Sequence, residues 1–498
     1  MKKAHCIMVQ GTMSGAGKSL LCAALCRIFA QDGYRVAPFK SQNMALNSFV
    51  TRDGLEMGRA QVVQAQAAGI EPDVRMNPIL LKPSSDVGSQ IIVNGEVRGQ
   101  MPASAYFRMK KSLIPEILAA YNSLAEDVDI IVIEGAGSPA EINLKADDIV
   151  NMGLAKLVDA PVLLAGDIDR GGVFAQLYGT VELLEPDERA RIKGLIINKF
   201  RGDVEILRPG LAMLEEKTHL PVLGVVPYLK VDLEDEDSLS TRLDAETAVK
   251  PLDVAILRLP HISNFTDFIP LEQHPLLGVR YVQNTRQLGH PDLLILPGTK
   301  NTVDDLLWLR QSGLEAAVQK LSAGGTPILG VCGGYQMLGE TLDDPDGCES
   351  GQPQSLRGLG LLPTHTTFTA QKRRTQVHAV TAAGPLDGAA LEGYEIHTGR
   401  TVVQGKSFCT LADGTPEGCI QENCFGTYLH GLFDTGELTE KLVCFLCGRK
   451  GIDPEAATVI PMEQYRQQQL DLLADGVRNA LDMDAIYTAM GMERRTPQ

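Results

Sequence analysis

The sequence predicts an α/β protein of two domains, each built on a mostly parallel, doubly wound sheet. Its 498 residues exceed what one hydrophobic core usually organises, so at least two domains are expected. Hydrophobic residues make up 44% of the chain and charged residues 22%, a composition that is ordinary for globular proteins and excludes general disorder. Short β-branched runs alternate with helical stretches in both halves, and this alternation is typical of parallel sheets.

Five buried strands are predicted in the first half of the chain. Each is a short apolar run that a helical pattern follows. They cover residues 6–10, 35–39, 129–133, 161–165 and 194–198. After Pro227 the chain becomes acidic and irregular, and no apolar period returns before Pro251. We therefore predict a first domain over residues 1–229 and an acidic linker over residues 230–252.

The alternation resumes after the linker, so residues 253–498 are predicted to form a second α/β domain. Its expected elements are strands and one helix, at residues 254–259, 293–296, 302–311 (the helix) and 328–331. Residues 462–492 carry a helical pattern of apolar side chains, and we expect this C-terminal helix to pack on the second domain.

The charge balance limits the partners that the protein can have. Its 46 Lys and Arg against 62 Asp and Glu leave a net charge of -16, which repels nucleic acid and anionic membrane surfaces. No apolar run approaches the roughly 18 to 20 residues of a membrane-spanning helix. We therefore expect a cytoplasmic protein that binds neither nucleic acid nor a membrane, and its 10 cysteines are expected to be reduced. The sequence leaves the oligomeric state open.

A phosphate-binding loop directly follows the first strand. Residues 11–19 read Gly-Thr-Met-Ser-Gly-Ala-Gly-Lys-Ser and lead into an apolar helical stretch. Glycines let backbone N–H groups converge on phosphate oxygens, Lys18 can reach the outer phosphates, and the Ser19 hydroxyl can bind Mg²⁺. Counted from Gly11, the spacing is one residue longer than the common form of this motif. The predicted ATP-binding residues are Gly11, Thr12, Ser14, Gly15, Gly17, Lys18, Ser19, Lys40 and Asn198, the last two lying at the ends of the second and fifth predicted strands.

Charged residues at the same sheet edge suggest a metal and an anionic substrate. Glu134 ends the third strand and is the best candidate to hold Mg²⁺ with Ser19. Asp53 is a weaker metal candidate, for which an ordinary turn aspartate is the alternative. The predicted substrate-binding residues are Lys82, Asp167, Asp169, Arg170, Lys199 and Arg201, and for each alone a surface salt bridge is the alternative. Their cations are expected to gather with Lys40 into a local positive site.

One cysteine of the second domain has the context of a nucleophile. Cys332 follows a strand directly and lies between small residues, which permit a sharp turn that exposes the sulfur. The N–H groups of Gly333 and Gly298 are candidates to bind an oxyanion. His430 is the expected base, with His397 as the alternative. The pair Cys444 and Cys447 lies in an apolar helical run and is interpreted as core packing.

Together these motifs resemble a known family. The Cys332 elbow with His430 resembles class I glutamine amidotransferases, which have a flavodoxin-like fold, and the phosphate loop with residues 134–137 resembles dethiobiotin synthetase-like ATPases. The two joined in this order are similar to the enzymes that amidate cobyrinic acid. Four segments resemble the cobyric acid branch in particular, namely residues 40–44, 167–172, 198–203 and 393–397.

This resemblance implies a substrate, a nitrogen source and two cofactors. The corrinoid substrate would be adenosylcobyrinic acid a,c-diamide, whose b, d, e and g carboxylates are amidated in turn. L-glutamine would supply ammonia through a thioester on Cys332, and ATP with Mg²⁺ would activate each carboxylate as an acyl phosphate. A sheltered path for ammonia is expected, because ammonia must stay unprotonated in transit.

One position departs from the family pattern. Triad amidotransferases usually carry a Glu two residues after the His, and here that residue is Leu432. Asp434 or Glu395 is expected to take its place, with a weaker or more tightly coupled glutaminase as the consequence.

Three alternative functions remain at this point. The first is an a,c-diamide synthase, with the same chemistry on other carboxylates. The second is a nucleotide switch of the deviant phosphate-loop kind, which usually has a Lys where Met13 stands. The third is a stand-alone dethiobiotin-type ligase, which would not need the second half.

Overall fold

The computed structural model describes residues 4–85, 88–233, 243, 249–349, 351–382, 384–454 and 461–495, which form two compact units. The first unit comprises Met1–Ala45, Glu56–Glu234 and Arg466–Gln498, and the second comprises Leu46–Leu55 and Asp235–Tyr465. The predicted two-domain α/β class is confirmed. The acidic residues Glu234 to Asp237 of the expected linker lie outside the described residues. The chain passes between the units more often than a single linker implies.

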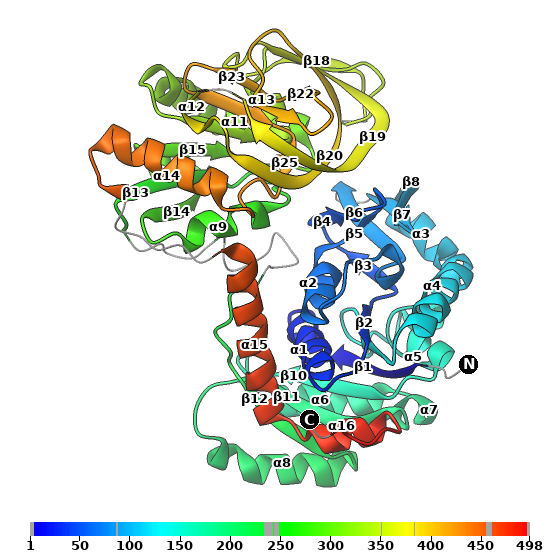
Figure 1. The fold of residues 1–498 in the computed structure, drawn as a ribbon. Helices are drawn as coiled ribbons and strands as arrows, with labels where there is room; N and C mark the ends of the chain where they lie inside the picture. Colours follow the sequence, from blue (N-terminus) through cyan, green and yellow to red (C-terminus); the bar gives the residue numbers. More distant parts are fainter. Residues whose placement is uncertain are drawn as a thin grey trace. The chain divides into compact units, whose positions relative to one another are not determined.

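A parallel sheet of six strands forms the centre of the first unit (Figure 1). Its order is β12-β11-β10-β1-β9-β2, and every neighbouring pair is parallel. The strands are β1 (His5–Gly11), β2 (Val36–Phe39), β9 (Ile130–Glu134), β10 (Val162–Asp167), β11 (Ile192–Phe200) and β12 (Val222–Pro227). All five strands predicted in this half are present. Because the strands are parallel, their carboxyl ends meet at one edge, where ligands bind in such sheets.

Helices connect these strands and cover the sheet. Ile7 and Val9 of β1 point into a core that the first helix completes, whereas Met8 between them points to the opposite face and is also fully buried. The helices are α1 (Lys18–Gln31), α2 (Arg59–Ala67), α3 (Ala103–Met109), α4 (Ile114–Asp127), α5 (Met152–Val158), α6 (Val173–Leu183), α7 (Pro186–Arg189), α8 (Val204–Thr218), α15 (Met462–Ala480) and α16 (Met483–Ala489).

The C-terminal helices α15 and α16 pack on the first unit, so their expected place on the second domain is wrong. Leu473 and Tyr487 are buried in the same cluster as α1, and Figure 1 shows both helices (red) beside this unit's sheet. Arg478 donates to Asp32 Oδ1 (2.7 Å), and the Tyr487 hydroxyl donates to Asp32 Oδ2 (2.8 Å). The sequence pattern revealed an apolar helical face, but an apolar face does not specify which core it will cover.

A smaller sheet belongs to the same unit and was not predicted. Its order is β3-β6-β7-β8, with β3 parallel to β6 and the other pairs antiparallel. The strands are β3 (Gln42–Met44), β6 (Ile79–Ser85), β7 (Gly88–Val93) and β8 (Glu96–Pro102). Two more short strands lie between β3 and α2, namely β4 (Ser48–Val50) and β5 (Glu56–Gly58). These runs are short or contain Gly and Pro, so they give a weak strand signal.

The second unit contains two sheets. The first has the order β14-β13-β15-β16-β24-β23 and is parallel except for β23. Its strands are β13 (Leu252–Leu257), β14 (Leu277–Val282), β15 (Leu293–Leu296), β16 (Ile328–Val331), β23 (Cys419–Gln421) and β24 (Cys424–Thr427). Its helices are α9 (Ile269–Gln273), α10 (Thr285–Leu288), α11 (Thr302–Gln311), α12 (Leu314–Ala323), α13 (Gly333–Leu338) and α14 (Glu437–Lys450). The strands and the helix α11 predicted for this half are confirmed.

The other sheet is built on a long antiparallel pair that the sequence did not reveal. Its order is β18-β17-β19-β20-β25, with β21 on β19 and β22 on β21. The strands are β17 (Thr341–Asp344), β18 (Gln354–Arg357), β19 (Thr364–Thr381), β20 (Ala390–Val403), β21 (Cys409–Leu411), β22 (Pro416–Glu417) and β25 (Leu429–His430). Within the described residues, none of the helices has both the length and the apolar character of a bilayer-spanning segment.

The packing of α15 predicts a local effect of a core substitution. Leu473→Ala should lower the free energy of unfolding of the first unit by about 2–5 kcal/mol, because a buried leucine leaves a cavity. Leu472→Ala is the matched control, since Leu472 is 56% exposed on the same helix. Hydrogen exchange followed by mass spectrometry on the full chain should show faster exchange in α1 and α15 for Leu473→Ala only. Faster exchange confined to β13–β16 would contradict the packing described here.

Candidate active sites

The phosphate loop of the first unit lies between β1 and α1. Gly15 and Gly17 have φ values of 75° and 91°, a region that glycine adopts without strain. A Cβ at Gly17 would lie 2.1 Å from Asn198 Nδ2, so this position also lacks room for a side chain. Asn198 Nδ2 donates a hydrogen bond to the Ala16 carbonyl oxygen (2.8 Å). Asn198, which was predicted to bind ATP, therefore connects β11 to the backbone of the phosphate loop.

Two lysines place ammonium groups on this loop. Lys18 Nζ donates to the carbonyl oxygens of Met13 (3.0 Å) and Gly137 (3.1 Å). Lys199 Nζ donates to the Gly15 carbonyl oxygen (2.6 Å) and to Asp167 Oδ2 (2.9 Å). Carbonyl groups hold both cations close to the position where a phosphate chain would lie in such a cradle.

Glu134 is the buried centre of a polar cluster beside the loop. Its Oε1 accepts hydrogen bonds from Ser19 Oγ (2.9 Å) and Lys40 Nζ (2.8 Å). Its Oε2 accepts from Gln61 Nε2 (3.3 Å) and Gln64 Nε2 (2.5 Å), both on α2. Burial by itself would raise the pKa of Glu134, but the charge of Lys40 and these hydrogen bonds outweigh it and lower the pKa. The structure thus brings together three predicted residues and adds two glutamines that sequence reasoning missed.

The atoms around Glu134 fit a magnesium ion. The Ser19 hydroxyl and the Glu134 carboxylate are hard oxygen ligands of the kind that Mg²⁺ prefers. Gln64 Oε1 is buried and has no hydrogen-bond partner among the described residues, so its lone pairs are available to a cation. Within the described residues, no group of three or more His, Cys, Asp or Glu side chains is arranged to hold a metal ion.

Asp53 and the Glu134 cluster belong to different units of the structure. It lies in an exposed turn of the segment Leu46–Leu55, which packs with the second unit. A metal-binding role of Asp53 therefore stays a prediction. Its exposed position in a turn is that of an ordinary turn aspartate, which was the alternative interpretation.

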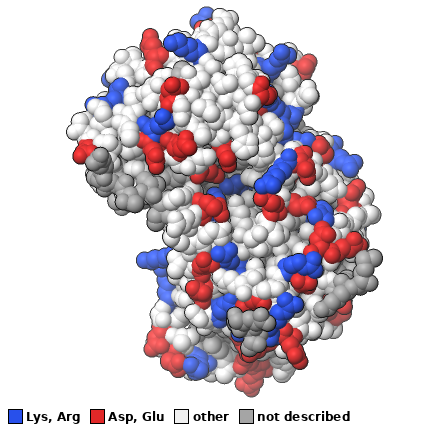
Figure 2. Space-filling model, viewed as in Figure 1, with Lys and Arg blue, Asp and Glu red and all other residues white. Residues whose placement is uncertain are grey.

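Four of the five predicted cations are paired with acids rather than gathered in an unopposed positive site. Lys82 forms a buried ion pair with Glu56 (2.8 Å), and Arg201 pairs with Asp169 (2.8 Å) and stacks over Tyr228. The pairs of Lys40 and Lys199 are those described above. On the face shown in Figure 2, Lys and Arg are likewise interspersed with Asp and Glu. Arg170 lies exposed after β10. An anionic substrate would have to exchange with the partner acids or bind beside neutralised pairs.

Cys332 lies in a strained turn between β16 and α13. Its φ of 52° and ψ of -108° are rare for a residue with a side chain, and such strain is typical of a nucleophile elbow. The turn depends on the glycines that follow: a Cβ at Gly334 would lie 2.0 Å from the Leu296 carbonyl oxygen. Gly333 is the first residue of α13, so its N–H has no acceptor within the helix. The Cys332 sulfur also lies 3.7 Å from the Ile396 carbonyl oxygen.

His430 lies between the thiol and a buried carboxylate that the sequence did not reveal. Its Nδ1 lies 2.6 Å from Asp267 Oδ2, and Asp267 Oδ1 accepts a hydrogen bond from the Gly431 N–H (3.0 Å). Burial by itself would lower the pKa of His430, but the charge and hydrogen bond of Asp267, with the Cys332 sulfur, raise it to about 10. A Cys–His–Asp arrangement therefore exists in which a protonated imidazole is stabilised next to the thiol.

The expectation that Asp434 or Glu395 replaces the missing triad Glu is wrong. Asp267 takes that place from the turn Phe265–Phe268, far from His430 in the sequence. Glu395 pairs with Arg373 (2.5 Å), and Leu432 is fully buried in the core. No sequence spacing relates Asp267 to His430. The available signal was an acidic residue in an otherwise apolar stretch.

His397 does not have the properties of the base. Its Nδ1 lies 2.7 Å from the Gly399 carbonyl oxygen and so carries the proton, and its ring stacks on Tyr428 at 3.6 Å. Burial lowers the pKa of His397 to about 4, which leaves the ring neutral. Its Nε2 is a buried acceptor without a partner in the described part of the chain.

Gly298 lies beside the histidine. A Cβ at Gly298 would lie 3.1 Å from His430 Cε1, and the Gly298 carbonyl oxygen accepts from the Ser263 N–H (2.9 Å). A Cβ at Gly333 would in turn meet Thr299, on the same loop as Gly298. The two predicted oxyanion residues are therefore both near the Cys–His pair, although their role stays a prediction.

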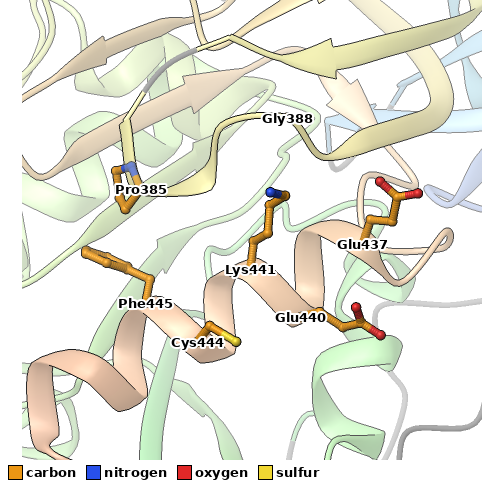
Figure 3. A pocket seen from close by; sticks show the side chains of 7 residues that line it. All are labelled: Pro385, Gly388, Glu437, Glu440, Lys441, Cys444 and Phe445. Atoms are coloured by element: carbon orange, nitrogen blue, oxygen red, sulfur yellow. The ribbon is translucent and has the colours of Figure 1, made fainter.

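A cavity elsewhere in the second unit contains none of the predicted site residues. It has a volume of about 550 Å³ and is lined by Pro385, Gly388, Glu437, Glu440, Lys441, Cys444 and Phe445 (Figure 3). Cys447 is buried in the core as expected, but Cys444 is exposed and lines this cavity, so its interpretation as core packing is wrong. Both cysteines lie on α14, but Cys444 is on its exposed side and Cys447 on its buried side.

Comparisons with known proteins match each half of the chain to a domain family and nearly the whole chain to named relatives. Residues 7–239 match the CobQ/CobB/MinD/ParA nucleotide binding domain, and residues 253–438 match the CobB/CobQ-like glutamine amidotransferase domain. The chain is 57% identical to the cobyric acid synthase of Lachnoclostridium phytofermentans, over 98% of this chain and 99% of that protein. It is 55% identical to that of Ruminiclostridium cellulolyticum, over 97% and 96%, and 52% identical to that of Salmonella heidelberg, over 97% and 98%.

The contact between Asp267 and His430 predicts a shift in the titration of the imidazole. Asp267→Asn removes the negative charge that favours the protonated ring, so the pKa of His430 should fall from about 10 by at least one unit. The rate of deuterium exchange at the C2 carbon of His430, measured by mass spectrometry against pH, reports this pKa directly. Asp434→Asn is the control and should leave the titration unchanged. An equal shift in both variants would remove Asp267 from its assigned place.

Proposed function

The chain belongs to the cobyric acid synthase family, and on that premise we propose how its two sites divide the work of ATP- and glutamine-dependent amidation. Cys332 with His430 and Asp267 releases ammonia from L-glutamine. The phosphate loop with Glu134 uses ATP to activate a corrinoid carboxylate. The observation that carries this assignment is the buried Cys–His–Asp arrangement, held in a unit separate from the phosphate loop.

In the second unit the reaction starts with attack of the Cys332 thiolate on the side-chain carbonyl of glutamine. The negative charge that develops on the oxygen is stabilised by N–H groups, for which Gly333 and Gly298 are the candidates. His430, held as an imidazolium by Asp267, gives its proton to the departing ammonia. Water then hydrolyses the glutamyl thioester, with His430 taking the proton, and glutamate leaves.

In the first unit a carboxylate oxygen of the corrinoid attacks the γ-phosphorus of ATP, and ADP leaves. Ammonia then attacks the acyl phosphate, an amide bond forms and inorganic phosphate departs. Lys18 and Lys199 are placed to neutralise the phosphate oxygens, because their ammonium groups already lie on the loop. With adenosylcobyrinic acid a,c-diamide as substrate, the cycle runs once for each of the b, d, e and g carboxylates.

Magnesium belongs to this proposal as a cofactor of the first unit. Ser19 and Glu134 would hold it, with Gln64 Oε1 as a further oxygen beside them. When bound, Mg²⁺ supplies positive charge to the phosphate oxygens of ATP. Lys40 meanwhile keeps Glu134 ionised in its buried position.

The names of the relatives bear on the alternative functions. The three relatives described above, which match nearly the whole chain, are named cobyric acid synthases. A nucleotide switch or a stand-alone ligase would leave the amidotransferase match and the Cys332 elbow without a role. We further propose that the reaction takes place in the cytoplasm, where ATP and glutamine are abundant and thiols stay reduced.

Two substitutions separate the roles of the sites. Cys332→Ala should abolish glutamine-driven amidation, by about 1000-fold or more, and should spare amidation with free ammonia, because only the nucleophile is lost. Lys18→Ala should abolish both activities. The measurement is mass spectrometry of cobyrinic acid a,c-diamide incubated with enzyme, ATP, Mg²⁺ and either nitrogen source, which counts acid-to-amide steps. A fully active Cys332→Ala enzyme with glutamine, or an unchanged corrinoid with the unaltered enzyme, would falsify the proposal.

The metal role of Glu134 predicts a change in nucleotide binding. Glu134→Gln should weaken the binding of ADP in the presence of Mg²⁺ by roughly 10-fold or more, and should affect binding in EDTA much less. Isothermal titration calorimetry with and without Mg²⁺ measures both. Equal weakening under the two conditions would show that Glu134 supports the loop instead of the metal.

A further inference from the structure

A short segment from the first half of the sequence, Leu46–Leu55, packs within the second unit. Backbone hydrogen bonds fix the chain within the first unit on both sides of it. The Ala45 N–H donates to the Leu81 carbonyl oxygen (3.2 Å), and the Glu56 N–H donates to the Gly95 carbonyl oxygen (3.2 Å). The segment is therefore a loop of the nucleotide-binding half that packs in a small apolar cluster with Tyr394 and Ile396 of the second unit.

Two residues of this segment hold Asn264. The Asn264 N–H donates to Asn47 Oδ1 (2.8 Å), and the Ser48 N–H donates to Asn264 Oδ1 (3.4 Å). All three residues are buried. Asn264 has a φ of 53°, in the left-handed region, and it begins the turn Phe265–Phe268 that carries Asp267. The Asn264 carbonyl oxygen also accepts from the Asp267 N–H (3.1 Å). The residue three positions before Asp267 is thus held in the left-handed region by one side chain, that of Asn47, and one backbone N–H, that of Ser48, both from the other half of the sequence.

The same segment holds the ring that stacks on the catalytic histidine. The Tyr394 hydroxyl donates to the Ser48 carbonyl oxygen (3.1 Å) and accepts from Asn264 Nδ2 (3.3 Å). The Tyr394 ring stacks on His430 with centroids 5.5 Å apart, and Phe49 packs edge-on against Tyr394 with centroids 5.4 Å apart. The segment therefore contacts both the turn that carries Asp267, through Asn264, and the Tyr394 ring that stacks on His430.

We infer that Asn47 and Phe49 are positioning residues for His430, acting through Asn264 and Tyr394. They fix the turn that presents Asp267 and the ring that restricts the imidazole. The inference rests on the proposed role of His430 in releasing ammonia. It assigns part of the glutaminase geometry to residues that precede the amidotransferase domain in the sequence.

The segment Leu46–Leu55 is joined at both ends to residues that contact Glu134 in the first unit. Lys40 precedes it by a few residues, Gln61 and Gln64 follow it on α2, and all three contact Glu134. A displacement of this cluster on nucleotide binding would therefore reach both ends of the segment Leu46–Leu55, because Lys40 precedes it and α2 follows it. Such coupling suits the chemistry, because ammonia released before an acyl phosphate exists would be protonated and lost. The rate of glutamine hydrolysis should thus depend on occupancy of the nucleotide and corrinoid sites.

The test uses full-length Asn47→Ala and Tyr394→Phe variants. Tyr394→Phe removes a single hydroxyl group and keeps the ring on His430. Both variants should lose roughly 10-fold in glutaminase kcat with little change in KM, and both should keep amidation with free ammonia, because they disturb the position of the imidazole alone. Asn284→Ala is the matched control, since Asn284 also accepts from a backbone N–H, but in an exposed helix cap of the same unit.

The coupling is measured as the ratio of glutamine hydrolysis with and without ATP, Mg²⁺ and the corrinoid. This ratio should exceed one in the unaltered enzyme and in Asn284→Ala, and should fall toward one in the two variants. Unchanged kcat and ratio in both variants would overturn the inference while leaving the proposed function intact. Failure of the proposed function is recognised separately, by glutamine-driven activity in Cys332→Ala. If Asn47→Ala does not fold, Tyr394→Phe decides the question.

Discussion

A carboxylate buried away from water must be paired, and this requirement organises both active sites of the protein. Glu134 in the first unit is surrounded by an ammonium group, a hydroxyl and two amides, and its pKa is lowered despite complete burial. Asp267 in the second unit is paired with the imidazole of His430. Glu134 fixes the position of Lys40, and Asp267 fixes the position of His430. Leaving either buried carboxylate unpaired would cost free energy, and this cost determines the geometry of each site.

Parallel sheets supply the surroundings in which these pairs form. The carboxyl ends of β1, β9, β10 and β11 bring the phosphate loop, Glu134, Asp167 and Asn198 to one edge of the first sheet. In the second unit the end of β16 presents Cys332 in a strained turn. Both turns need glycine, because a side chain at Gly17 or Gly334 would collide with its neighbours. Backbone packing therefore limits the residue types around each reactive group as strongly as the chemistry does.

The path of the chain links the two units by more than one connection. The C-terminal helices return to the first unit and cover α1, the helix that begins at the phosphate loop. Conversely, the segment Leu46–Leu55 comes from the first half of the sequence but belongs to the second unit, where it contacts Tyr394 and Asn264. Each unit is thus completed by residues from the other half of the sequence.

The sequence by itself determined the features that depend on local order. The two α/β domains, the positions of their main strands along the chain, the phosphate loop, Glu134, the Cys332 elbow and His430 all followed from runs of neighbouring residues, because hydrophobic periodicity and glycine-rich turns are local properties. Only the tertiary structure decided which distant residues meet. Asp267 as the partner of His430, the glutamines around Glu134 and the first unit as the place of α15 have no fixed spacing in the sequence. They are set by packing and by the pairing of buried charge, which local patterns do not encode.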